Sequence, residues 1–304
     1  MRIIFLGTPE FAVESLRALV ENECDVVAVV TAPDKPAGRG QQLQQSPVKQ
    51  YAVSAGIPVL QPEKLKNPSF LEELKNYQAD LQIIVAFRML PEVVWNMPPL
   101  GTFNLHASLL PQYRGAAPIN WAVMNGETET GVSTFFLQQE IDTGPLIFQE
   151  KEPISDEDTV GSLYDRLMKR GAQLVLKTVW AIESGEYPQI SQPEITEMKA
   201  APKIFRETCE IDWMKPVEVV RNQIRGLAPY PAAWTTLTGK TCKIYWANKS
   251  SYQEEAMPGS YRTDRKSYLQ FRCADGWLAI EELQLEGKKR MEIEEFLRGM
   301  QGKL

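Results

Sequence analysis

Arg2-Ile-Ile-Phe-Leu-Gly7 is the stretch of sequence that decides the fold. An apolar run of this length that ends in glycine is typical of a strand buried on both faces of a parallel sheet. Thr8 and Pro9 suit the first turn of a helix, and the apolar residues 25–31 predict the next strand. A strand, a helix and a strand in this order open a doubly wound, Rossmann-like α/β domain.

The same patterns extend this domain along the chain. They predict strands over 57–60, 80–87, 101–104, 131–137 and 146–150, and helices over 69–78, 119–125 and 159–185. Residues 32–49 are predicted to be a loop, and the proline-containing residues 186–205 a linker across a domain boundary. Only Gly7 stands where a G-x-G-x-x-G fingerprint would be needed, which disfavours a bound nicotinamide dinucleotide.

From Thr208 onward the pattern changes to short strands separated by turns. Strands are expected over 233–237, 241–246, 267–272 and 276–285, with helices over 216–224 and 292–299. Short strands at this spacing predict a small barrel or sandwich. The predicted organisation is therefore an α/β domain over 1–188, a linker over 189–206 and a β-rich domain over 207–304.

Charge is distributed unevenly along the chain. Residues 1–200 carry 16 Lys+Arg and 25 Asp+Glu, a balance of −9, whereas residues 201–304 carry 17 and 14, a balance of +3. The change of sign fits a C-terminal half that faces a polyanion, although two solvated surfaces can differ in this way by chance. The long loop 32–49 is also basic, with Lys35, Arg39 and Lys49 against Asp34.

The four cysteines and the N-terminus bear on the compartment. The cysteines form no C-x-x-C pair, which suits reduced thiols in a cytosolic protein. The first apolar run is too short for a signal peptide, and no stretch approaches the length of a membrane span. We therefore expect a cytoplasmic protein without a membrane segment.

The only histidine of the chain, His106, lies two residues after Asn104. On an extended segment both side chains point to the same side. Pro111 then ends any strand, and α/β sheets bind their ligands beyond the carboxyl ends of their strands. The pair is therefore a candidate for catalysis, the alternative being a structural histidine.

Asp142 follows another predicted strand, so it could converge with Asn104 and His106. Beside Thr143 and Gly144 it could equally be a turn-forming aspartate. A lone histidine without clustered carboxylates or thiols does not make a zinc site, so no metal is expected.

Several motifs together carry a resemblance to a known family. Asn104-Leu-His106, Ser108-Leu-Leu-Pro111, Tyr113-Arg-Gly115 and Asp142-Thr-Gly144 resemble the core of the formyltransferases that use 10-formyltetrahydrofolate. Further stretches resemble the branch of the family whose acceptor is methionine carried by initiator tRNA; they are residues 5–12, 33–40, 46–49, 210–213, 224–231 and 287–290. The resemblance covers essentially the whole chain.

The resemblance implies roles for particular residues. The catalytic trio would be Asn104, His106 and Asp142. The folate site would be lined by Phe87, Arg88, Met89, Leu90, Ser108, Leu109, Leu110 and Pro111. The tRNA contacts, with Arg39 as the key residue of the loop, would come from Lys35, Arg39, Lys49, Lys203, Arg206, Arg221, Arg225, Lys288, Lys289 and Arg290.

It also implies a formyltransferase domain followed by an OB-like barrel that holds part of the tRNA. The co-substrate would be 10-formyltetrahydrofolate, with no tightly bound cofactor, no DNA partner and a monomeric enzyme. The chain departs from its relatives at Gln41 and Gln42, where lysines are common, and at Arg88, where glycine is common. The first departure puts the strength of the loop's phosphate contact in question.

The expected chemistry is attack of the methionine amine on the formyl carbon. The Asn104 amide and an N–H of His106 suit donors to the formyl oxygen, which makes His106 a polariser more than a general base. Asp142 would orient the imidazole and favour its protonated form. The alternatives are a formyltransferase acting on an amino-sugar nucleotide, a nucleic-acid-binding module that has lost catalysis, and an NAD-dependent enzyme.

Overall fold

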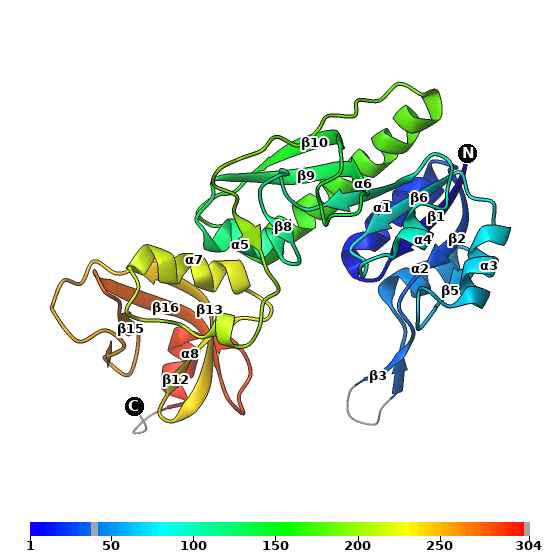
Figure 1. Cartoon of the computed structure of the whole chain (residues 1–304). Coiled ribbons are helices and arrows are strands. Elements are labelled where there is room, and N and C mark those ends of the chain that lie inside the picture. Colours follow the sequence, from blue (N-terminus) through cyan, green and yellow to red (C-terminus); the bar gives the residue numbers. More distant parts are fainter. Residues whose placement is uncertain (38–41, 301–304) are drawn as a thin grey trace. The chain divides into compact units, whose positions relative to one another are not determined.

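The computed structural model describes residues 1–37 and 42–300 (Figure 1). Its residues gather into two compact units that interleave along the chain. The α/β unit comprises Met1–Arg114, Gly131–Glu152 and Tyr164–Lys199, and the β unit comprises Gly115–Thr130, Pro153–Leu163 and Ala200–Leu304. The predicted linker is divided between them at residue 199. The sequence-based domain bounds 1–188 and 207–304 stay a prediction about contiguous stretches of chain.

The α/β unit is built from alternating strands and helices, the last three of which extend a few residues into the β unit. In chain order these are β1 (Arg2–Gly7), α1 (Glu10–Glu21), β2 (Asp25–Val30), β3 (Lys35–Ala37), β4 (Gln42–Gln44), α2 (Pro47–Ser54), β5 (Val59–Leu60), α3 (Pro68–Asn76), β6 (Leu81–Val85), α4 (Glu92–Trp95), β7 (Thr102–His106), β9 (Glu129–Phe136), β10 (Leu146–Pro153) and α6 (Val160–Ser184).

The main sheet has the strand order β10-β9-β7-β6-β1-β2-β5 (Figure 1). β5, β2, β1, β6 and β7 run parallel, and β9 runs antiparallel to β7. The chain moves from β1 to β2 on one side and returns to β6 on the other, which is the doubly wound arrangement expected from the sequence. The carboxyl ends of β6 and β7 therefore meet at one edge, where such sheets bind ligands.

Opposite faces of the sheet are covered by different helices. Ile4 and Leu6 of β1 share a core with Phe70 of α3 and Val94 of α4. Near the other end of the sheet, α6 lies against β7 so closely that a Cβ atom on Gly171 would be 2.7 Å from the Leu105 side chain. On this helix-covered face, Thr134 of β9 and Thr178 of α6 are joined by a hydroxyl–hydroxyl hydrogen bond of 3.0 Å. β7 is thus held from the side on which Leu105 points.

The predicted loop 32–49 is wrong over β3 and β4 and at its C-terminal end. β3 and β4 form an antiparallel hairpin in which Lys35 pairs with Gln44, and α2 begins at Pro47. Ser46 caps this helix by accepting a hydrogen bond of 3.1 Å from the Lys49 N–H. The hairpin lacks the apolar alternation of a half-buried strand, and its Leu43 is exposed, so the period-2 signal was weak.

The β unit contains the remaining elements. Those outside its sheet are α5 (Pro118–Met124), η1 (Glu207–Cys209), α7 (Val217–Leu227), α8 (Ile293–Arg298) and the two-residue strands β8 (Arg114–Gly115), which straddles the units, and β11 (Ala200–Ala201). The sheet is formed by β12 (Ala233–Leu237), β13 (Lys240–Lys249), β14 (Tyr261–Thr263), β15 (Leu269–Arg272), β16 (Trp277–Leu285) and β17 (Met291–Glu292).

This sheet is antiparallel, with the order β12-β13-β16-β15-β14 and with β17 paired to β16. It closes over one core, in which Val220 and Ile224 of α7 pack with strand residues such as Leu283. Trp213 stacks on Phe271 at a centroid distance of 4.5 Å. The small OB-like β domain expected from the sequence is confirmed.

Residues 1–37 and 42–300 contain neither a helix suited to span a membrane nor a clustered metal site. None of the helices described there has the length and apolar composition needed to cross a membrane. The same residues hold no group of three or more His, Cys, Asp or Glu side chains arranged to bind a metal ion.

Candidate active site

Strand β7 presents Asn104 and His106 on the same face of the sheet. Its neighbours fix this arrangement: Asn104 is in register with Ile84 of β6 and Phe135 of β9, and His106 with Ser133 of β9. Leu105, between them, points to the opposite face and packs against α6. The structure therefore brings together the amide and the imidazole that the sequence predicted to share a side.

The imidazole of His106 is held by one backbone group. The side chain is only 7% exposed, and its Nε2 atom lies 2.8 Å from the carbonyl oxygen of Tyr113. A carbonyl oxygen can only accept, so Nε2 carries a proton. Nδ1 consequently has a free lone pair in the neutral ring and an N–H in the imidazolium. In the described part of the chain, neither Nδ1 nor the Asn104 amide has a hydrogen-bond partner.

The loop after β7 is fixed by its own hydrogen bonds. Ser108 donates from Oγ to the Gln112 carbonyl at 2.7 Å. Ser133 of β9 donates to the Ser108 carbonyl at 2.6 Å and accepts from the Leu110 N–H at 3.1 Å. Tyr113 is buried and has a left-handed φ of 59°. The carbonyl group that holds His106 is therefore part of a rigid turn.

Asp142 lies in the turn between β9 and β10. It has a φ of 56°, a left-handed conformation that aspartate tolerates better than most residues. Gly144 is required by close packing, because a Cβ atom there would be 1.7 Å from the Phe136 carbonyl oxygen. Gln192 donates from Nε2 to the carbonyls of Asp142 and Gly144, at 2.8 and 2.9 Å. The same Gln192 side chain accepts from Arg114, the residue after Tyr113, so the turn is tied to the His106 surroundings.

The predicted folate-lining residues fall at the ends of two adjacent parallel strands. Phe87–Leu90 follow β6 and Ser108–Pro111 follow β7, so the structure places both groups at one edge of the sheet. Ser108, Leu110 and Pro111 are buried, as is Leu90, whereas Phe87 and Leu109 are half-buried and Arg88 and Met89 are exposed. Arg88 donates to the carbonyl groups of Pro62 and Glu63. Its guanidinium therefore already donates hydrogen bonds to backbone carbonyl groups of the protein.

The predicted tRNA contacts of the basic loop are in different situations. Lys35 is exposed on β3, and Arg39 and Gln41 lie outside the described residues. Lys49 forms an ion pair of 2.6 Å with Asp34. The pKa of the Asp34 carboxyl is lowered mainly by the hydrogen bond that it accepts from Lys49. A second hydrogen bond, from Gln61, lowers this pKa further. Lys49 therefore already has an anionic partner.

Arg221 and Arg225 are buried in the β unit, although the sequence offered them as phosphate contacts. Arg225 is 3% exposed and donates to the Asn222 side chain and to the carbonyls of Ser155 and Asp158, at 2.7–3.0 Å. Burial lowers the pKa of its guanidinium. Arg221 donates to a backbone carbonyl at 2.8 Å. In this structure both guanidinium groups donate hydrogen bonds to backbone carbonyls of the same unit and are buried from solvent.

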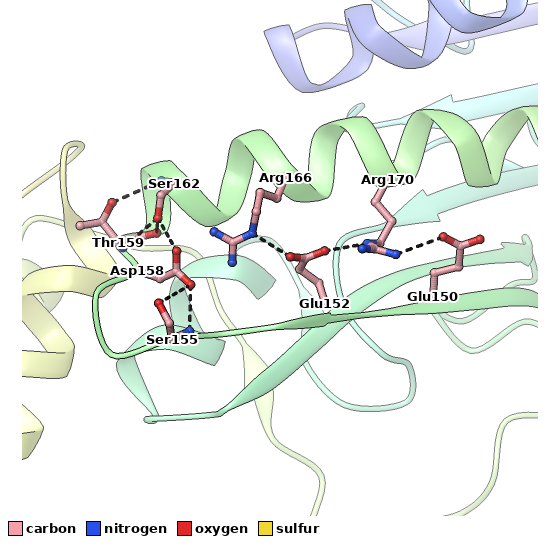
Figure 2. Close-up of polar contacts among 8 residues, drawn as sticks. All are labelled: Glu150, Glu152, Ser155, Asp158, Thr159, Ser162, Arg166 and Arg170. Atoms are coloured by element: carbon pink, nitrogen blue, oxygen red, sulfur yellow. Dashed lines mark hydrogen bonds and ion pairs between the residues drawn. The ribbon is translucent and has the colours of Figure 1, made fainter.

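The segment that Arg225 holds is itself ordered by Asp158. The Asp158 carboxylate accepts from the N–H and Oγ of Ser155 and from Oγ of Ser162 in the first turn of α6 (Figure 2). These contacts order the turn before α6, which carries the two carbonyl groups that Arg225 binds; the helix itself is capped by Thr159, whose hydroxyl accepts from the Ser162 N–H at 3.3 Å. They support a structural role for Arg225.

The remaining predicted tRNA contacts are exposed; they are Lys203, Arg206, Lys288, Lys289 and Arg290. Arg206 lies over the Trp234 ring, 5.4 Å from its centroid. Lys289 pairs with Glu295 at 2.9 Å, and Arg290 pairs with Glu282 at 2.5 Å. The basic patch 288–290 is thus partly neutralised by carboxylates of its own unit.

Four residues that organise the site were given no role by the sequence. Arg114 and Gln192 tie the Asp142 turn to the loop after β7. Ser133 and Gln149 hold that loop, since Gln149 donates to the Leu110 carbonyl at 3.0 Å and to Ser133 at 2.8 Å. Arg114 stood inside a recognised motif, but the other three carry no local signal because their partners are 16 to 78 residues away.

Comparison with protein families now decides the class of protein. Residues 1–179 match the model of the formyl transferase family, and residues 203–301 match that of the formyl transferase C-terminal domain. The chain belongs to the formyl transferase family. The resemblance seen in the motifs around Asn104 and Asp142 is thereby confirmed.

Curated relatives of this formyl transferase are similar over nearly their whole length. A protein of Parabacteroides distasonis named methionyl-tRNA formyltransferase is 59% identical over 309 residues, covering 98% of this chain and 95% of the relative. A protein of Bacteroides fragilis with the same name is 56% identical, with the same coverage.

Solved structures share the fold at lower identity. HypX from Aquifex aeolicus in complex with tetrahydrofolic acid superposes with a TM-score of 0.67 at 20% identity, covering 99% of this formyl transferase and 48% of that chain. The sugar 3N-formyl transferase WlaRD superposes with a TM-score of 0.69 at 20% identity, covering 95% of this chain and 99% of that one. At this identity the two structures support the fold alone.

Proposed function

We propose that this protein transfers the formyl group of 10-formyltetrahydrofolate to the α-amine of methionine esterified to initiator tRNA. The products are N-formylmethionyl-tRNA and tetrahydrofolate. Two supports combine here: relatives that are 56–59% identical carry the name methionyl-tRNA formyltransferase, and the geometry of the site suits the chemistry. The enzyme acts as a monomer in the cytoplasm and uses the folate as a co-substrate that dissociates after each turnover.

The observation that carries the chemistry is the pairing of His106. Its Nε2–H is used by the Tyr113 carbonyl, so only Nδ1 is left for the substrate. As the imidazolium, His106 donates from Nδ1 to the formyl oxygen, and the Asn104 amide on the same face of β7 donates beside it. Such oxyanion donors contribute on the order of 2.7–4 kcal/mol each.

The bonds change in a balanced order. The amine nitrogen of methionine attacks the formyl carbon, and a C–N bond forms while the formyl oxygen becomes negatively charged between Asn104 and His106. The bond from the formyl carbon to the folate nitrogen then breaks. The proton that leaves the amine ends on that nitrogen, relayed by a water held at Asp142 or His106.

Asp142 orients the catalytic imidazole. The folate ring system sits at the edge formed by the segments after β6 and β7, where Met89 and Leu109 offer apolar surface. Most of the acceleration comes from holding the amine against the formyl carbon, because effective molarities of about 10⁵ M or more are accessible to well-oriented groups.

The tRNA is bound through its phosphates and shape. The exposed cations at Lys35, Lys203, Arg206 and Lys288, together with Arg39, provide these contacts. Arg39 acts on the acceptor end, so Arg39→Ala raises the KM for tRNA and leaves the KM for folate unchanged.

A direct assay tests the proposed function. The purified protein is mixed with 10-formyltetrahydrofolate and initiator tRNA charged with radiolabelled methionine, and formyl-methionine is measured after release from the tRNA. A parallel reaction contains an amino-sugar nucleotide in place of the tRNA. Turnover of the sugar amine without formyl-methionine would overturn the proposal in favour of a sugar formyltransferase.

A further inference from the structure

The segment after α6, which the sequence predicted to be a linker, is hydrogen-bonded at both of its ends to strands and loops that border the candidate active site. Ile190 pairs with Leu146 of β10 through two backbone hydrogen bonds of 2.8 and 2.9 Å. Nine residues later, the Lys199 carbonyl accepts from the Tyr113 N–H at 2.6 Å. We call residues 190–199 the strap.

Gln192 of the strap joins two loops of the candidate active site. Its amide nitrogen donates to the carbonyls of Asp142 and Gly144, which belong to the turn after β9. Its amide oxygen accepts from Nε and Nη2 of Arg114, at 3.2 and 2.5 Å. Arg114 follows Tyr113, whose carbonyl holds His106. Both ends of one side chain are therefore used to connect the Asp142 turn with the support of His106.

We propose that Gln192 is a positioning residue for formyl transfer, an inference that rests on the proposed function. Its two donated hydrogen bonds hold the Asp142 turn at the distance from the His106 support that catalysis requires. In this turn Asp142 has a left-handed φ, and its side chain is half-buried. A displacement of about 1 Å at a reacting geometry can cost on the order of 10²-fold in rate.

Two substitutions separate the halves of this connection. Gln192→Ala removes the bonds to the turn and to Arg114. Gln192→Glu keeps an acceptor for the Arg114 guanidinium but has no N–H to give to the turn. If the donated bonds matter, both variants lose activity; if Gln192 only anchors the strap through Arg114, Gln192→Glu behaves as wild type.

Gln112→Ala is the matched control. The Gln112 side chain also ties the strap to the loop after β7, donating to the Glu197 carbonyl at 3.2 Å and accepting from the Lys199 N–H at 2.8 Å. None of its contacts in the described chain reaches the Asp142 turn. A general loosening of the strap would therefore appear in this variant as well.

Steady-state kinetics and hydrogen exchange provide the readouts. We expect kcat to fall about 10- to 100-fold in Gln192→Ala and Gln192→Glu, with each KM within about threefold of wild type. Gln112→Ala should lose less than about threefold, in line with a contact remote from the reacting atoms. Amide exchange over residues 138–144 should accelerate in both Gln192 variants and not in Gln112→Ala.

The outcomes that contradict the inference differ from those that contradict the function. Normal kcat or normal exchange in Gln192→Glu overturns the positioning role, as does an equal loss in Gln112→Ala. Absence of formyl-methionine from the wild-type enzyme overturns the proposed function, whereas the exchange experiment still decides whether Gln192 restrains the turn.

Discussion

Two polar clusters of the α/β unit differ in how completely their groups are paired. In the first, the buried Glu152 of β10 accepts hydrogen bonds of 2.7 Å from both Arg166 and Arg170 of α6 (Figure 2). In the second, the Asn104 amide and Nδ1 of His106 have no partner within residues 1–37 and 42–300. Both clusters lie on strands of the same sheet, so neighbouring side chains could have paired the polar groups of either cluster.

The difference indicates what each cluster is for. A charge removed from water is costly unless it is paired, and the Glu152 cluster meets this condition with its own residues. Polar groups left open in a half-buried site weaken the fold unless a ligand completes them. The open cluster is therefore the site where we propose that the reaction takes place, and the closed cluster is a structural joint between β10 and α6. Each prediction below perturbs one side of this comparison.

The largest effect is expected at the open cluster. His106→Ala removes the proposed donor to the formyl oxygen, and activity should fall by about 10³-fold or more, combining a lost oxyanion donor with lost proton transfer. The thermal midpoint should stay within about 3 °C of wild type, since the ring makes one hydrogen bond to the protein. Steady-state rates and calorimetry on the same preparation check both statements. Near-normal turnover would return His106 to a structural role.

The opposite pattern is expected at the closed cluster. Glu152→Ala leaves Arg166 and Arg170 without their shared acceptor, and the free energy of unfolding should drop by about 2 kcal/mol. The activity per folded molecule should not change. Glu150→Ala is the control, because its contacts with Arg170 and Lys177 are longer, at 3.6 and 4.0 Å, and partly exposed. Its cost should be below about 1 kcal/mol, as for other exposed pairs. Equal costs at the two positions would contradict the assigned difference.

The Glu152 cluster should also make the stability of the protein depend on pH in the acid range. Burial alone would raise the pKa of Glu152, but the hydrogen bonds and charges of Arg166 and Arg170 outweigh it and lower the pKa. A carboxyl whose pKa is lower in the folded state stabilises the protein above its unfolded pKa of about 4.3, and this contribution is lost as the pH falls through the folded value. The stability gap between wild type and Glu152→Gln should therefore shrink below about pH 4. Urea titrations between pH 3 and 7 measure it, and a gap that widens in acid would refute the assignment.

A feature could be predicted from the sequence where a local pattern encodes it. The strands around β1 and β7 were predictable because an apolar run that ends at glycine or a polar pair carries its own signal. Asn104, His106 and Asp142 followed from strand ends and from recognised motifs. The strap and the hairpin of β3 and β4 were not predictable in this way. The hairpin pairs residues that are close in sequence, such as Lys35 with Gln44, but lacks an alternating apolar pattern.

The order of the strap depends on partners that are distant in sequence. Gln192, for example, meets Asp142 across 50 residues, and no local pattern encodes that contact. For the same reason Arg225 was predicted to bind phosphate. A buried arginine and an exposed one look alike in a sequence until the fold supplies carbonyls such as that of Ser155.

The smallest effects are expected at two cations of the β unit, the exposed Lys288 and the buried Arg225. Lys288→Ala removes an exposed charge, so unfolding should change by less than about 0.5 kcal/mol, while the slope of log affinity for tRNA against log salt should fall by about one. Arg225→Met retains much of the side-chain volume but leaves the Ser155 and Asp158 carbonyls without their donor. It should destabilise the unit by about 2 kcal/mol and leave the salt slope of the folded protein unchanged. Denaturant titration and salt-dependent tRNA binding test the pair together. A reduced salt slope in folded Arg225→Met would show that this guanidinium reaches the tRNA after all, and it would remove burial as the criterion for sorting the predicted contacts.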